Sequence, residues 1–416
     1  MLRYSRAAVL AGALLVTSAP SLAETVSLNQ AVAKALEAAP LLRAEEAAIA
    51  AARAGKVQAD VRPNPSVTVE AENFVGTGPY SVLRRAEVTA TYNQPIERGG
   101  KRAARVALAE REIGVASAFA EVTRLELAAA VQRSFLNILI AQQIEAIAKQ
   151  QLSIEEGLQG EALRRVRGYK DPLFVKTRAA ARVAQAQIAV EQSQAQLRNA
   201  RDALASFWGG NGDDLDVVGE LVLGGNQKVE LAEADQALEE ARVARASAAV
   251  MVEQTRKTQD YTVNGGTRFI KGTNDIALVA GITIPLGRFD RNQGNIERAR
   301  AERLRLELTA EANRLERLRR RASLGAEADR ALSRAEAIKS EVYPRVAKTL
   351  AQVREGYNRG GFSFRDMQDA ADAIIVAQDK WLTAMIEYRD LQTELDRLTG
   401  RFDASIAAIN EGYTQP

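Results

Sequence analysis

The sequence predicts a mainly α-helical chain with a small β part, built twice on one plan of helix, two strands, long helix, turn and helix. Three observations predict this fold class. The same landmarks occur twice along the chain, short alternating segments lie between helical ones, and the helical stretches are far longer than those of compact domains. We therefore expect a long coiled-coil α-helical barrel that continues into a membrane β-barrel, with four strands from each chain.

The first 23 residues have the pattern of a secretory signal peptide. Two arginines precede an apolar run over residues 7–16, and the triplet Ser21, Leu22, Ala23 fits a signal-peptidase site before Glu24. We expect an exported mature chain that begins at Glu24, with an uncleaved N-terminal anchor as the alternative. The mature chain has no further apolar run of this length, so membrane insertion is expected to use strands.

The composition argues against an enzyme or a resident metal. The chain contains neither cysteine nor histidine, so disulfides, thiolate metal sites, a lipidated cysteine and the commonest general base are all absent. Phosphate-loop, hydrolase-elbow and metal-helix motifs are absent too. We expect no cofactor, no metal site and no catalytic residue.

The charge pattern does not indicate nucleic acid. The net charge is +3, and the 56 basic residues are interspersed with 53 acidic ones. The most basic window, residues 298–321, also holds glutamates along one predicted helix. A solvated helix face explains this window better than a polyanion site.

Two landmarks mark the duplication. Pro95 separates an alternating segment from a long helical one, and Pro285 does the same in the second half. A Gly-Tyr pair at Gly168 and another at Gly356 interrupt the two long helical stretches at nearly the same offset. The predicted domains are the signal peptide 1–23, a first repeat 24–207, a linker 208–228, a second repeat 229–400 and a tail 401–416.

Each repeat is expected to contain one very long helix and two shorter ones. The predicted helices cover residues 28–60, 102–167, 173–207, 229–257, 293–355 and 363–400. The helix over 102–167 would be about 100 Å long at ~1.5 Å per residue, which no compact domain accommodates. In each repeat the two shorter helices together match the long one, so we infer four long rods per chain.

Alternating apolar and polar residues predict four strands. They cover residues 67–72, 86–92, 261–263 and 276–284. Their period alone does not distinguish a membrane sheet from an ordinary half-buried one. Because the smallest membrane barrels use about eight strands, four cannot close a barrel, and a symmetric ring of identical chains is expected.

The duplicated plan, residues 63–66 and 72–74 around the first strand, and residues 94–102 after the second resemble the TolC-type outer-membrane efflux proteins. The resemblance covers nearly all of residues 28–400 and is strongest to the heavy-metal branch, of cobalt-zinc-cadmium type. It implies a homotrimer with one twelve-stranded barrel in the outer-membrane lipid and a helical tunnel in the periplasm. Some metal-branch members look like lipoproteins, whereas this chain has no cysteine to acylate.

The resemblance also implies a function and partners. The chain would be the passive exit duct of a tripartite efflux pump, carrying heavy-metal cations delivered by a proton-driven inner-membrane resistance-nodulation-division pump and a periplasmic adaptor (membrane fusion) protein. A drug-efflux or type I secretion channel is the alternative with the same fold. An exported periplasmic coiled-coil scaffold is the alternative without a pore.

The resemblance places a periplasmic gate at Asp366 and Asp369, which open the final predicted helix on one face. Six carboxylates would gather near the threefold axis of a trimer and attract cations. A structural alternative is a helix cap, because Ser363 and Asp366 have capping-box spacing. Tyr357 resembles a tyrosine that ties neighbouring helices together in the closed state, or it is a packed helix-end side chain.

Two further sets of residues are expected around this gate. Lys176 and Arg178 carry the opposite charge in the first repeat and could pair with the aspartates across the entrance. The resemblance places adaptor contact at the two tight turns, over residues 168–172 and 356–363. The residues expected there are Gly168, Tyr169, Gly356, Gly360 and Gly361.

Overall fold

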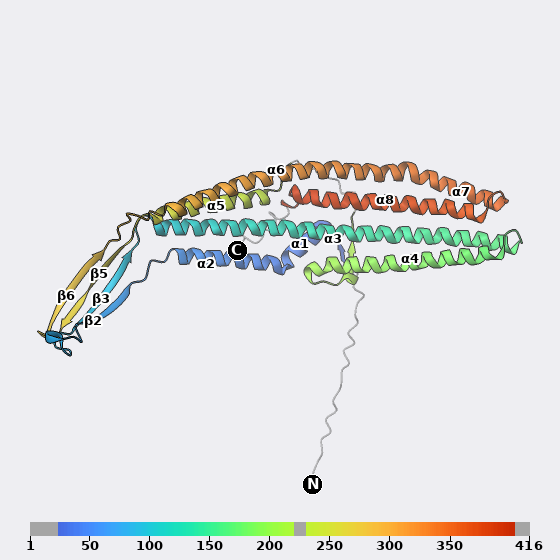
Figure 1. Ribbon diagram of the computed structural model, residues 1–416. Helices are drawn as coiled ribbons and strands as arrows, with labels where there is room; N and C mark the ends of the chain where they lie inside the picture. Colours follow the sequence, from blue (N-terminus) through green and yellow to red (C-terminus); the bar gives the residue numbers. More distant parts are fainter. Residues whose placement is uncertain (1–23, 220–229, 404–416) are drawn as a thin grey trace, which may run out of the picture. The chain divides into compact units, whose positions relative to one another are not determined.

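The computed structural model describes residues 24–219 and 230–403 (Figure 1). The predicted signal peptide lies outside these ranges. The chain forms two compact units, each containing segments of both sequence halves. The turn unit comprises Met1–Ala31, Ser134–Leu223 and Thr349–Ile375, and the sheet unit comprises Val32–Arg133, Gly224–Lys348 and Val376–Pro416.

The helices of the first half follow the prediction with one correction. They are α1 (Leu28–Ala38), α2 (Pro40–Ala59), α3 (Lys101–Arg167) and α4 (Leu173–Ala205), and α3 is one helix of 67 residues. The single helix predicted over 28–60 is wrong, because the chain breaks at Ala39, whose backbone is extended. Pro40 opens α2: it has no N–H to continue α1, and its fixed φ suits a first helical position.

The helices of the second half are α5 (Glu233–Arg256), α6 (Gln293–Ala337), α7 (Tyr343–Arg359) and α8 (Phe364–Leu398). The helix predicted over 293–355 is interrupted by a π-helix, η4 (Ile338–Val342). Pro344 lies two residues after the end of η4, and its ring would clash with the carbonyl of Ser340 in a regular α-helix. The wider turn therefore accommodates the proline without ending the rod.

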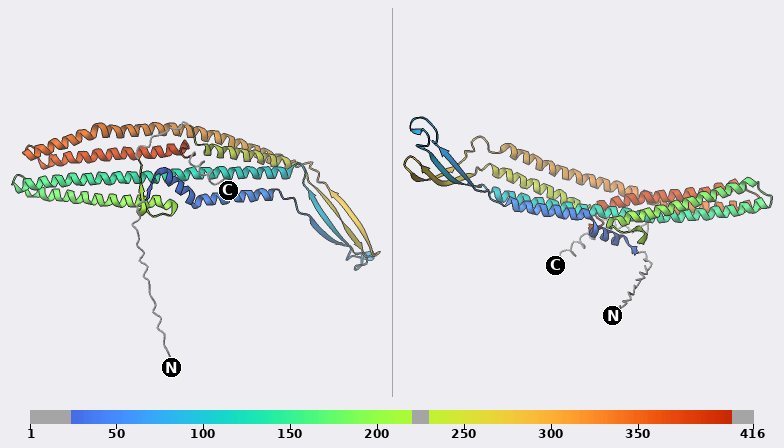
Figure 2. Two further views of the ribbon diagram at one scale, coloured as in Figure 1. Left: turned by 180° about the vertical axis from the view of Figure 1, so that it is seen from behind. Right: turned by 90° about the horizontal axis from the view of Figure 1, so that it is seen from below.

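Four antiparallel strands form the sheet of the sheet unit, in the order β2-β3-β5-β6. The strands are β2 (Ser66–Glu72), β3 (Glu87–Ile96), β5 (Tyr261–Ile270) and β6 (Asp275–Thr283). All four predicted strands are confirmed, and β5 is longer than the predicted 261–263. Figure 2 shows the four strands side by side in both views.

The register gives the sheet one apolar and one polar face. Residues opposite each other on neighbouring strands share a face. One face carries Val67, Val69, Val88, Ala90, Tyr92, Val263, Phe269, Ile276, Leu278, Ala280 and Ile282. The other carries Thr68, Glu70, Glu72, Glu87, Thr89, Thr91, Asn93, Asn264, Arg268 and Asp275. Most of the large apolar side chains on the first face are exposed in the single chain.

The predicted linker over residues 208–228 contains regular structure that the sequence did not indicate. A short 3-10 helix (Gly212–Asp214) leads into β4 (Leu215–Val217), which pairs in parallel with β1 (Glu24–Val26). Val26, Leu215 and Val217 are buried. This small sheet belongs to the turn unit, and residues 220–228 of the predicted linker lie outside the described residues.

Inside each unit, helices pack through a narrow set of buried apolar residues. In the sheet unit, α6 buries Leu324, Ala328, Ala331 and Ala335, a helical spacing whose small side chains allow close approach. In the turn unit, the apolar cluster includes Leu158, Val175, Phe364 and Met367. Within the described residues, no helix is both long and apolar enough to cross a membrane.

Candidate functional site at the helix turns

The first turn presents an aromatic side chain to solvent. It joins α3 to α4, and Gly168 donates its N–H to the carbonyl of Arg164 at 3.1 Å. Tyr169 follows with φ 57°, a left-handed conformation uncommon for a non-glycine residue, and is 98% exposed. Pro172 precedes α4 and fixes where the new helix starts.

The second turn joins α7 to α8 through two glycines. Gly360 has φ 87° and donates to the carbonyl of Tyr357 at 3.0 Å, and Gly361 donates to that of Gly356 at 2.9 Å. These bonds satisfy the last carbonyls of α7. Gly356 was predicted in the turn but lies inside α7, where a Cβ would collide with the ring of Phe362.

Asp366 forms the helix cap that the sequence offered as an alternative to a gate. Its carboxylate accepts hydrogen bonds from the backbone N–H and the hydroxyl of Ser363, each at 2.7 Å. The Ser363 hydroxyl in turn accepts from the Asp366 N–H at 3.2 Å. These bonds lower the pKa of Asp366, because they favour the charged carboxylate. Asp366 remains exposed to solvent while it forms this cap.

Asp369 lies one turn further along α8 and is exposed. Its nearest basic group is Arg365, four residues earlier, at 4.0 Å. Lys176 and Arg178 are exposed on α4, and neither forms an ion pair with another described residue of the chain. The structure therefore leaves the Asp369 carboxylate and the two cations free of strong partners in the described part of one chain.

Tyr357 is fully buried and joins the second turn to the first. Its hydroxyl donates to Asp171, whose carboxylate also accepts two hydrogen bonds from Arg165 at 3.0 Å. The Arg165 guanidinium lies 4.4 Å from the centroid of the Tyr357 ring. The centroid of the Phe364 ring lies 6.1 Å from that of Tyr357. Tyr357 thus links the two turns within the chain, and its predicted role in a closed state stays a prediction.

The electrostatics of this cluster favour the link. Burial, then the bond to Asp171, raises the pKa of Tyr357, so its hydroxyl keeps the proton that it donates. Burial alone would raise the pKa of Asp171, but the hydrogen bonds from Arg165 and Tyr357 lower it below its usual value. The pair is therefore a neutral phenol and a charged carboxylate held by an arginine.

Sequence reasoning missed further ion pairs in the turn unit. Arg182 on α4 donates to Glu155 on α3 at 2.8 Å and also binds Asp372 on α8. Arg354 on α7 binds Glu161 on α3, which is almost fully buried. Each partner lies far from the other in sequence, so no local spacing could have indicated the pair. Together with Tyr357, these pairs tie the first helical hairpin to the second.

Exposed apolar residues surround the turns. Leu173 and Phe174 follow Tyr169 at the start of α4, and Phe362 lies in the second turn. All four side chains are exposed in the single chain. A cluster of large exposed apolar residues at a helix turn is typical of a surface that binds another protein.

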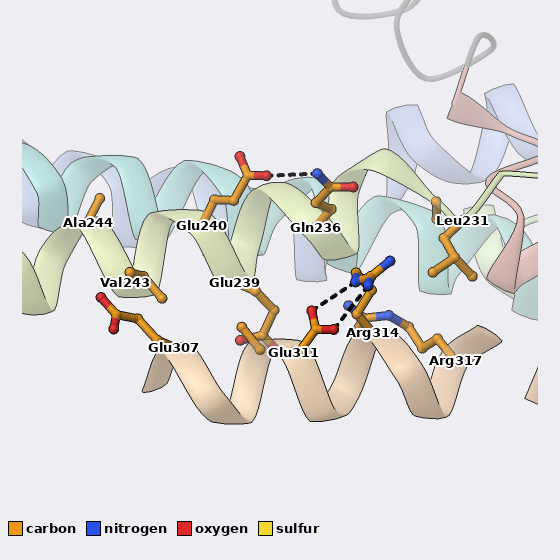
Figure 3. Close-up of a pocket in the computed structure, with 12 residues that line it drawn as sticks. Leu231, Gln236, Glu239, Glu240, Val243, Ala244, Glu307, Glu311, Arg314 and Arg317 are labelled. Atoms are coloured by element: carbon orange, nitrogen blue, oxygen red, sulfur yellow. Dashed lines mark hydrogen bonds and ion pairs between the residues drawn. The ribbon is translucent and has the colours of Figure 1, made fainter. Parts of the chain in front are cut away.

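The sheet unit contains a groove of about 460 Å³ between α5 and α6 (Figure 3). Val243, Ala244 and Ala310 line it together with charged residues. Its charges are paired locally, as Arg314 with Glu311 at 2.9 Å, and α6 repeats such pairs along residues 298–321. This supports the predicted solvated helix face. Among the described residues, no group of three or more potential metal ligands occurs.

Comparison with known proteins identifies the family. A family model described as outer membrane efflux protein matches residues 31–210. The chain is 30% identical over 357 residues to the cobalt-zinc-cadmium resistance protein CzcC of Cupriavidus metallidurans, covering 83% of both chains. The chain belongs to the outer membrane efflux protein family. The nickel-cobalt-cadmium resistance protein NccC of Alcaligenes xylosoxydans xylosoxydans is a second relative of this outer membrane efflux protein, 26% identical over 320 residues and 71% of each chain.

Solved structures share the fold. The outer membrane protein VceC of Vibrio cholerae matches with a TM-score of 0.71 at 18% identity, over 90% of this chain and 96% of that one. The channel protein CusC matches with a TM-score of 0.70 at 16% identity, over 97% and 98%. The predicted mainly helical, TolC-like fold and the placement in the outer membrane are confirmed for this outer membrane efflux protein.

Proposed function

We propose that the chain is the trimeric exit duct of a tripartite efflux pump and that it passes divalent heavy-metal cations. The observation that supports this cargo is the similarity of the chain to relatives named for resistance to cobalt, zinc, cadmium and nickel. An inner-membrane pump of the resistance-nodulation-division type and a periplasmic adaptor deliver the cations. We also propose that residues 1–23 are a signal peptide and that residues 24–207 and 229–400 are two repeats of one plan.

The sheet supports the proposed ring of three chains. Its edge strands, β2 and β6, have unpaired edges in the single chain, and its apolar face is exposed. Pairing edges around a threefold axis would satisfy their backbone groups and direct the apolar face to lipid. The polar face would then line the duct, with Glu70, Glu72, Glu87 and Asp275 outnumbering Arg268.

The cations are attracted by charge and are not coordinated. The chain has no histidine or cysteine, so selection among metals belongs to the pump. In the proposed trimer, Asp366 and Asp369 line the periplasmic entrance and raise the local cation concentration. Lys176 and Arg178 pair with them across the entrance in the closed state, while Tyr357 holds the two turns together.

The turns are the proposed contact with the adaptor. The residues proposed for this contact are Gly168, Tyr169, Gly360 and Gly361 in the turns and Gly356 near the end of α7, and the exposed apolar side chains of Leu173 and Phe174 support the proposal. The positive φ of Gly360 and Tyr169 fixes the shape of each turn. A rigid turn loses little entropy when a partner binds it.

The test is single-channel conductance of the purified, detergent-extracted trimer in a planar bilayer, comparing the wild type with the double variant Asp366→Asn, Asp369→Asn. Asparagine keeps the oxygen that caps the helix but removes the charge. The variant therefore tests the effect of the charge on conduction while the helix cap is preserved. We expect cation-over-anion selectivity to fall and block by millimolar divalent cations on one side to weaken several-fold. Unchanged selectivity and block would contradict the gate.

A matched control is Asp379→Asn on the same helix, where the exposed carboxylate lies outside the turn. This control should keep the wild-type selectivity. A well-extracted chain that forms neither trimers nor conductance steps would contradict the channel itself.

A further inference from the structure

The end of the sheet away from the helices, called here the hairpin end, carries a folded loop with exposed apolar side chains. This loop, residues 73–86, joins β2 to β3, and the Leu83 N–H donates to the carbonyl of Phe74 at 3.0 Å. A short 3-10 helix, η1 (Gly78–Tyr80), lies within it. The loop is therefore folded back on itself. Its exposed large apolar side chains are Phe74, Val75, Tyr80, Val82 and Leu83.

Three basic residues gather at the hairpin end. Arg84 and Arg85 close the first loop, and residues 271–274 join β5 to β6. A Cβ on Gly272 would lie 3.5 Å from the carbonyl oxygen of Arg84 and 3.8 Å from Cγ of Arg85, so the two connections lie against each other. Lys271 begins the second connection. All three basic side chains are exposed, and none forms an ion pair with another described residue.

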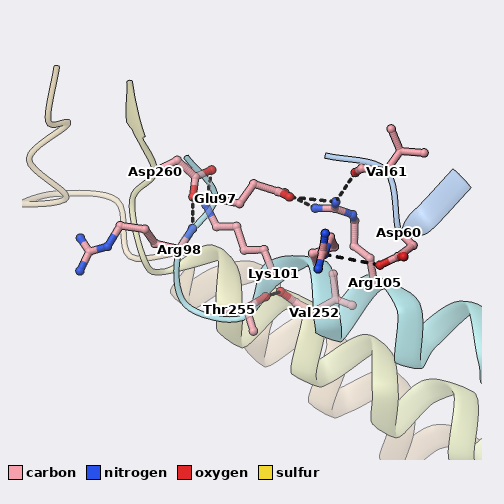
Figure 4. Close-up of polar contacts among 10 residues, drawn as sticks. Asp60, Val61, Glu97, Arg98, Lys101, Arg105, Val252, Thr255 and Asp260 are labelled. Atoms are coloured by element: carbon pink, nitrogen blue, oxygen red, sulfur yellow. Dashed lines mark hydrogen bonds and ion pairs between the residues drawn. The ribbon is translucent and has the colours of Figure 1, made fainter. Parts of the chain in front are cut away.

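Basic residues at the opposite end of β3 are paired with carboxylates instead. Lys101 forms an ion pair with Asp260 at 2.8 Å, and Arg105 donates to Glu97 at 3.1 Å (Figure 4). The hairpin end thus differs in having basic groups without acidic partners among the described residues, next to exposed apolar side chains. Such a surface suits a ligand that is both anionic and apolar.

The register places Lys271 on the apolar face of the sheet. Its N–H donates to the carbonyl of Ala86 at 2.9 Å, one step beyond the pair of Glu87 and Ile270. Residues two apart on a strand point to the same face, so Lys271 follows Phe269 on the apolar side.

The acidic residues of the hairpin end lie on the polar face. Glu72 and Glu87 lie opposite each other there and both pair with Arg268, at 3.6 and 3.1 Å. Asp275 belongs to the same face. Carboxylates are therefore on one side of the sheet and the Lys271 ammonium is on the other, which favours an anionic group that approaches from the apolar side.

The length of the apolar face places the hairpin end at the level of lipid headgroups. Apolar side chains alternate from Ile276 to Ile284, about 26 Å along the strand at ~3.3 Å per residue. At a strand tilt of about 40°, they span ~20 Å of a bilayer, close to the apolar band of about 25 Å in membrane barrels. Lys271 lies beyond this band, because Phe269 is the residue opposite Ile276. A lysine stem reaches from apolar surroundings to a polar interface.

The hairpin end faces the outer leaflet, because the chain belongs to an outer membrane family whose helices extend into the periplasm. The main lipid of that leaflet is lipopolysaccharide, a glycolipid with phosphate groups next to its acyl chains. We propose that the hairpin end binds this lipid. Arg84, Arg85 and Lys271 contact its phosphates, and the apolar side chains of residues 73–86 pack on its acyl chains. The inference rests on the proposed contact of the apolar face with lipid.

The residue types fit a phosphorylated lipid better than a free phosphate. A guanidinium donates two parallel hydrogen bonds to one phosphate, and the loop ends in two neighbouring arginines. The Arg85 guanidinium lies 5.9 Å from the centroid of the Tyr80 ring, and aromatic side chains are typical of the membrane interface. A free phosphate would leave the exposed apolar side chains uncovered, whereas a lipid contacts both groups.

The test is binding of purified lipopolysaccharide with a short carbohydrate chain to the extracted native protein, followed by native mass spectrometry in detergent. The test variant is Arg84→Gln, Arg85→Gln, Lys271→Gln. Each basic residue near an anionic lipid surface strengthens binding roughly five-fold, so we expect this variant to bind about 100-fold more weakly than the wild type.

The matched control is Arg330→Gln, Lys339→Gln, Lys348→Gln. It removes the same charge from exposed positions along α6, η4 and α7, far from the strands in sequence, and should keep wild-type binding.

The phosphate contact is tested separately with the wild type alone. Lipopolysaccharide from which the phosphates have been removed should bind about 100-fold more weakly than the intact lipid, by the same charge argument. Inorganic phosphate at the concentration of the lipid should not displace it. This comparison needs no substitution, so it holds even if the triple variant fails to fold.

The apolar contact is tested with Phe74→Ser, Val75→Ser. Both side chains are exposed in the protein and would lose their burial against acyl chains. We expect about ten-fold weaker binding of the intact and the dephosphorylated lipid alike, because this loss is independent of charge.

The outcomes separate this inference from the proposed function. Wild-type trimers that conduct ions but bind intact and dephosphorylated lipopolysaccharide equally would overturn the lipid site and leave the channel standing. Equal losses in the test and control variants would also overturn it, because net charge alone would explain the binding. A test variant that keeps lipid binding but no longer forms trimers would assign the hairpin end to contact between copies. A wild type that binds the lipid as expected but forms neither trimers nor conductance steps would contradict the channel alone.

Discussion

Tyr357 connects two turns that are far apart in sequence through one hydroxyl. Its partner, Asp171, is held charged by Arg165 and is nearly buried. A charged carboxylate that accepts several hydrogen bonds in a buried position stabilises the folded state only while it stays ionised. The cluster is therefore a pH-sensitive contact at the residue scale.

We predict that Asp171→Asn lowers the stability at pH 7 by about 1.5–3 kcal/mol, the range for hydrogen bonds to a charged group. The folded-state pKa of Asp171 is lowered, so its contribution is complete above the unfolded pKa of about 3.9 and is lost as the pH falls through the folded value. The difference between wild type and variant should thus shrink below about pH 4.

Thermal unfolding followed by circular dichroism, at several pH values from 3 to 7, measures that difference. Comparing the variant with wild type cancels the titration of all other carboxylates. A gap that stays constant over the whole range would show that the Asp171 charge does not contribute through Tyr357 and Arg165.

The contacts of some single residues could be predicted from the sequence, and those of others could not. The Asp366 cap could be predicted because Ser363 and Asp366 lie three residues apart. At a helix N-terminus, side chains with this spacing contact each other. The pair between Asp171 and Tyr357 depends on two hairpins meeting in space. No local rule encodes such a meeting, so Asp171 and Arg165 were missed.

The second turn depends on a helix position that only glycine can occupy. Gly356 lies within α7, and the Phe362 ring fills the space where its Cβ would be. We predict that Gly356→Ala destabilises the protein by about 1–3 kcal/mol, because the ring or the turn must shift to admit the methyl group. Chemical unfolding of the extracted protein measures the change.

Gly160 provides the matched control for that substitution. It lies inside α3, and a Cβ there would meet nothing within 4 Å. Gly160→Ala should therefore stabilise the protein by about 0.5–1 kcal/mol through helix propensity. If both alanine variants shift stability in the same direction, the packing argument for Gly356 is wrong.

Elements were predictable where the signal was periodic and long. The 67-residue α3 and the strands β2, β3 and β6 follow directly from their patterns, whereas only the first three residues of β5 were predicted. The breaks at Pro40 and at η4 before Pro344 had a visible cause in the prolines, but the long helical period on both sides outweighed it. The pairing of β1 with β4 was out of reach, because three-residue strands carry no periodic signal.

The duplicated sequence does not correspond to two compact halves. Each unit takes segments from both repeats, so segments of the two units alternate along the chain. The sheet illustrates the reason: β3 and β5 belong to different repeats, yet they form the central pair. The boundaries of the two sequence repeats, 24–207 and 229–400, remain a prediction.

The apolar face of the sheet is the feature that the proposed membrane position must explain. Leu278 is exposed on that face and Val279 lies on the polar one, although they are neighbours in β6. We predict that Leu278→Arg lowers the stability in a bilayer by about 2–4 kcal/mol, the cost of a cation on a lipid-facing strand near the midplane. Val279→Arg should cost far less, because its side chain would enter the water-filled side.

The measurement is urea unfolding of protein refolded into lipid vesicles, together with the fraction of chain recovered in outer membranes. The two variants add the same charge at adjacent positions, so differences in net charge or expression signals cancel. Equal losses for both would mean that the two faces do not meet different solvents. A larger loss for Val279→Arg would place lipid on the polar face, which would contradict both the proposed duct and the attraction of cations along it.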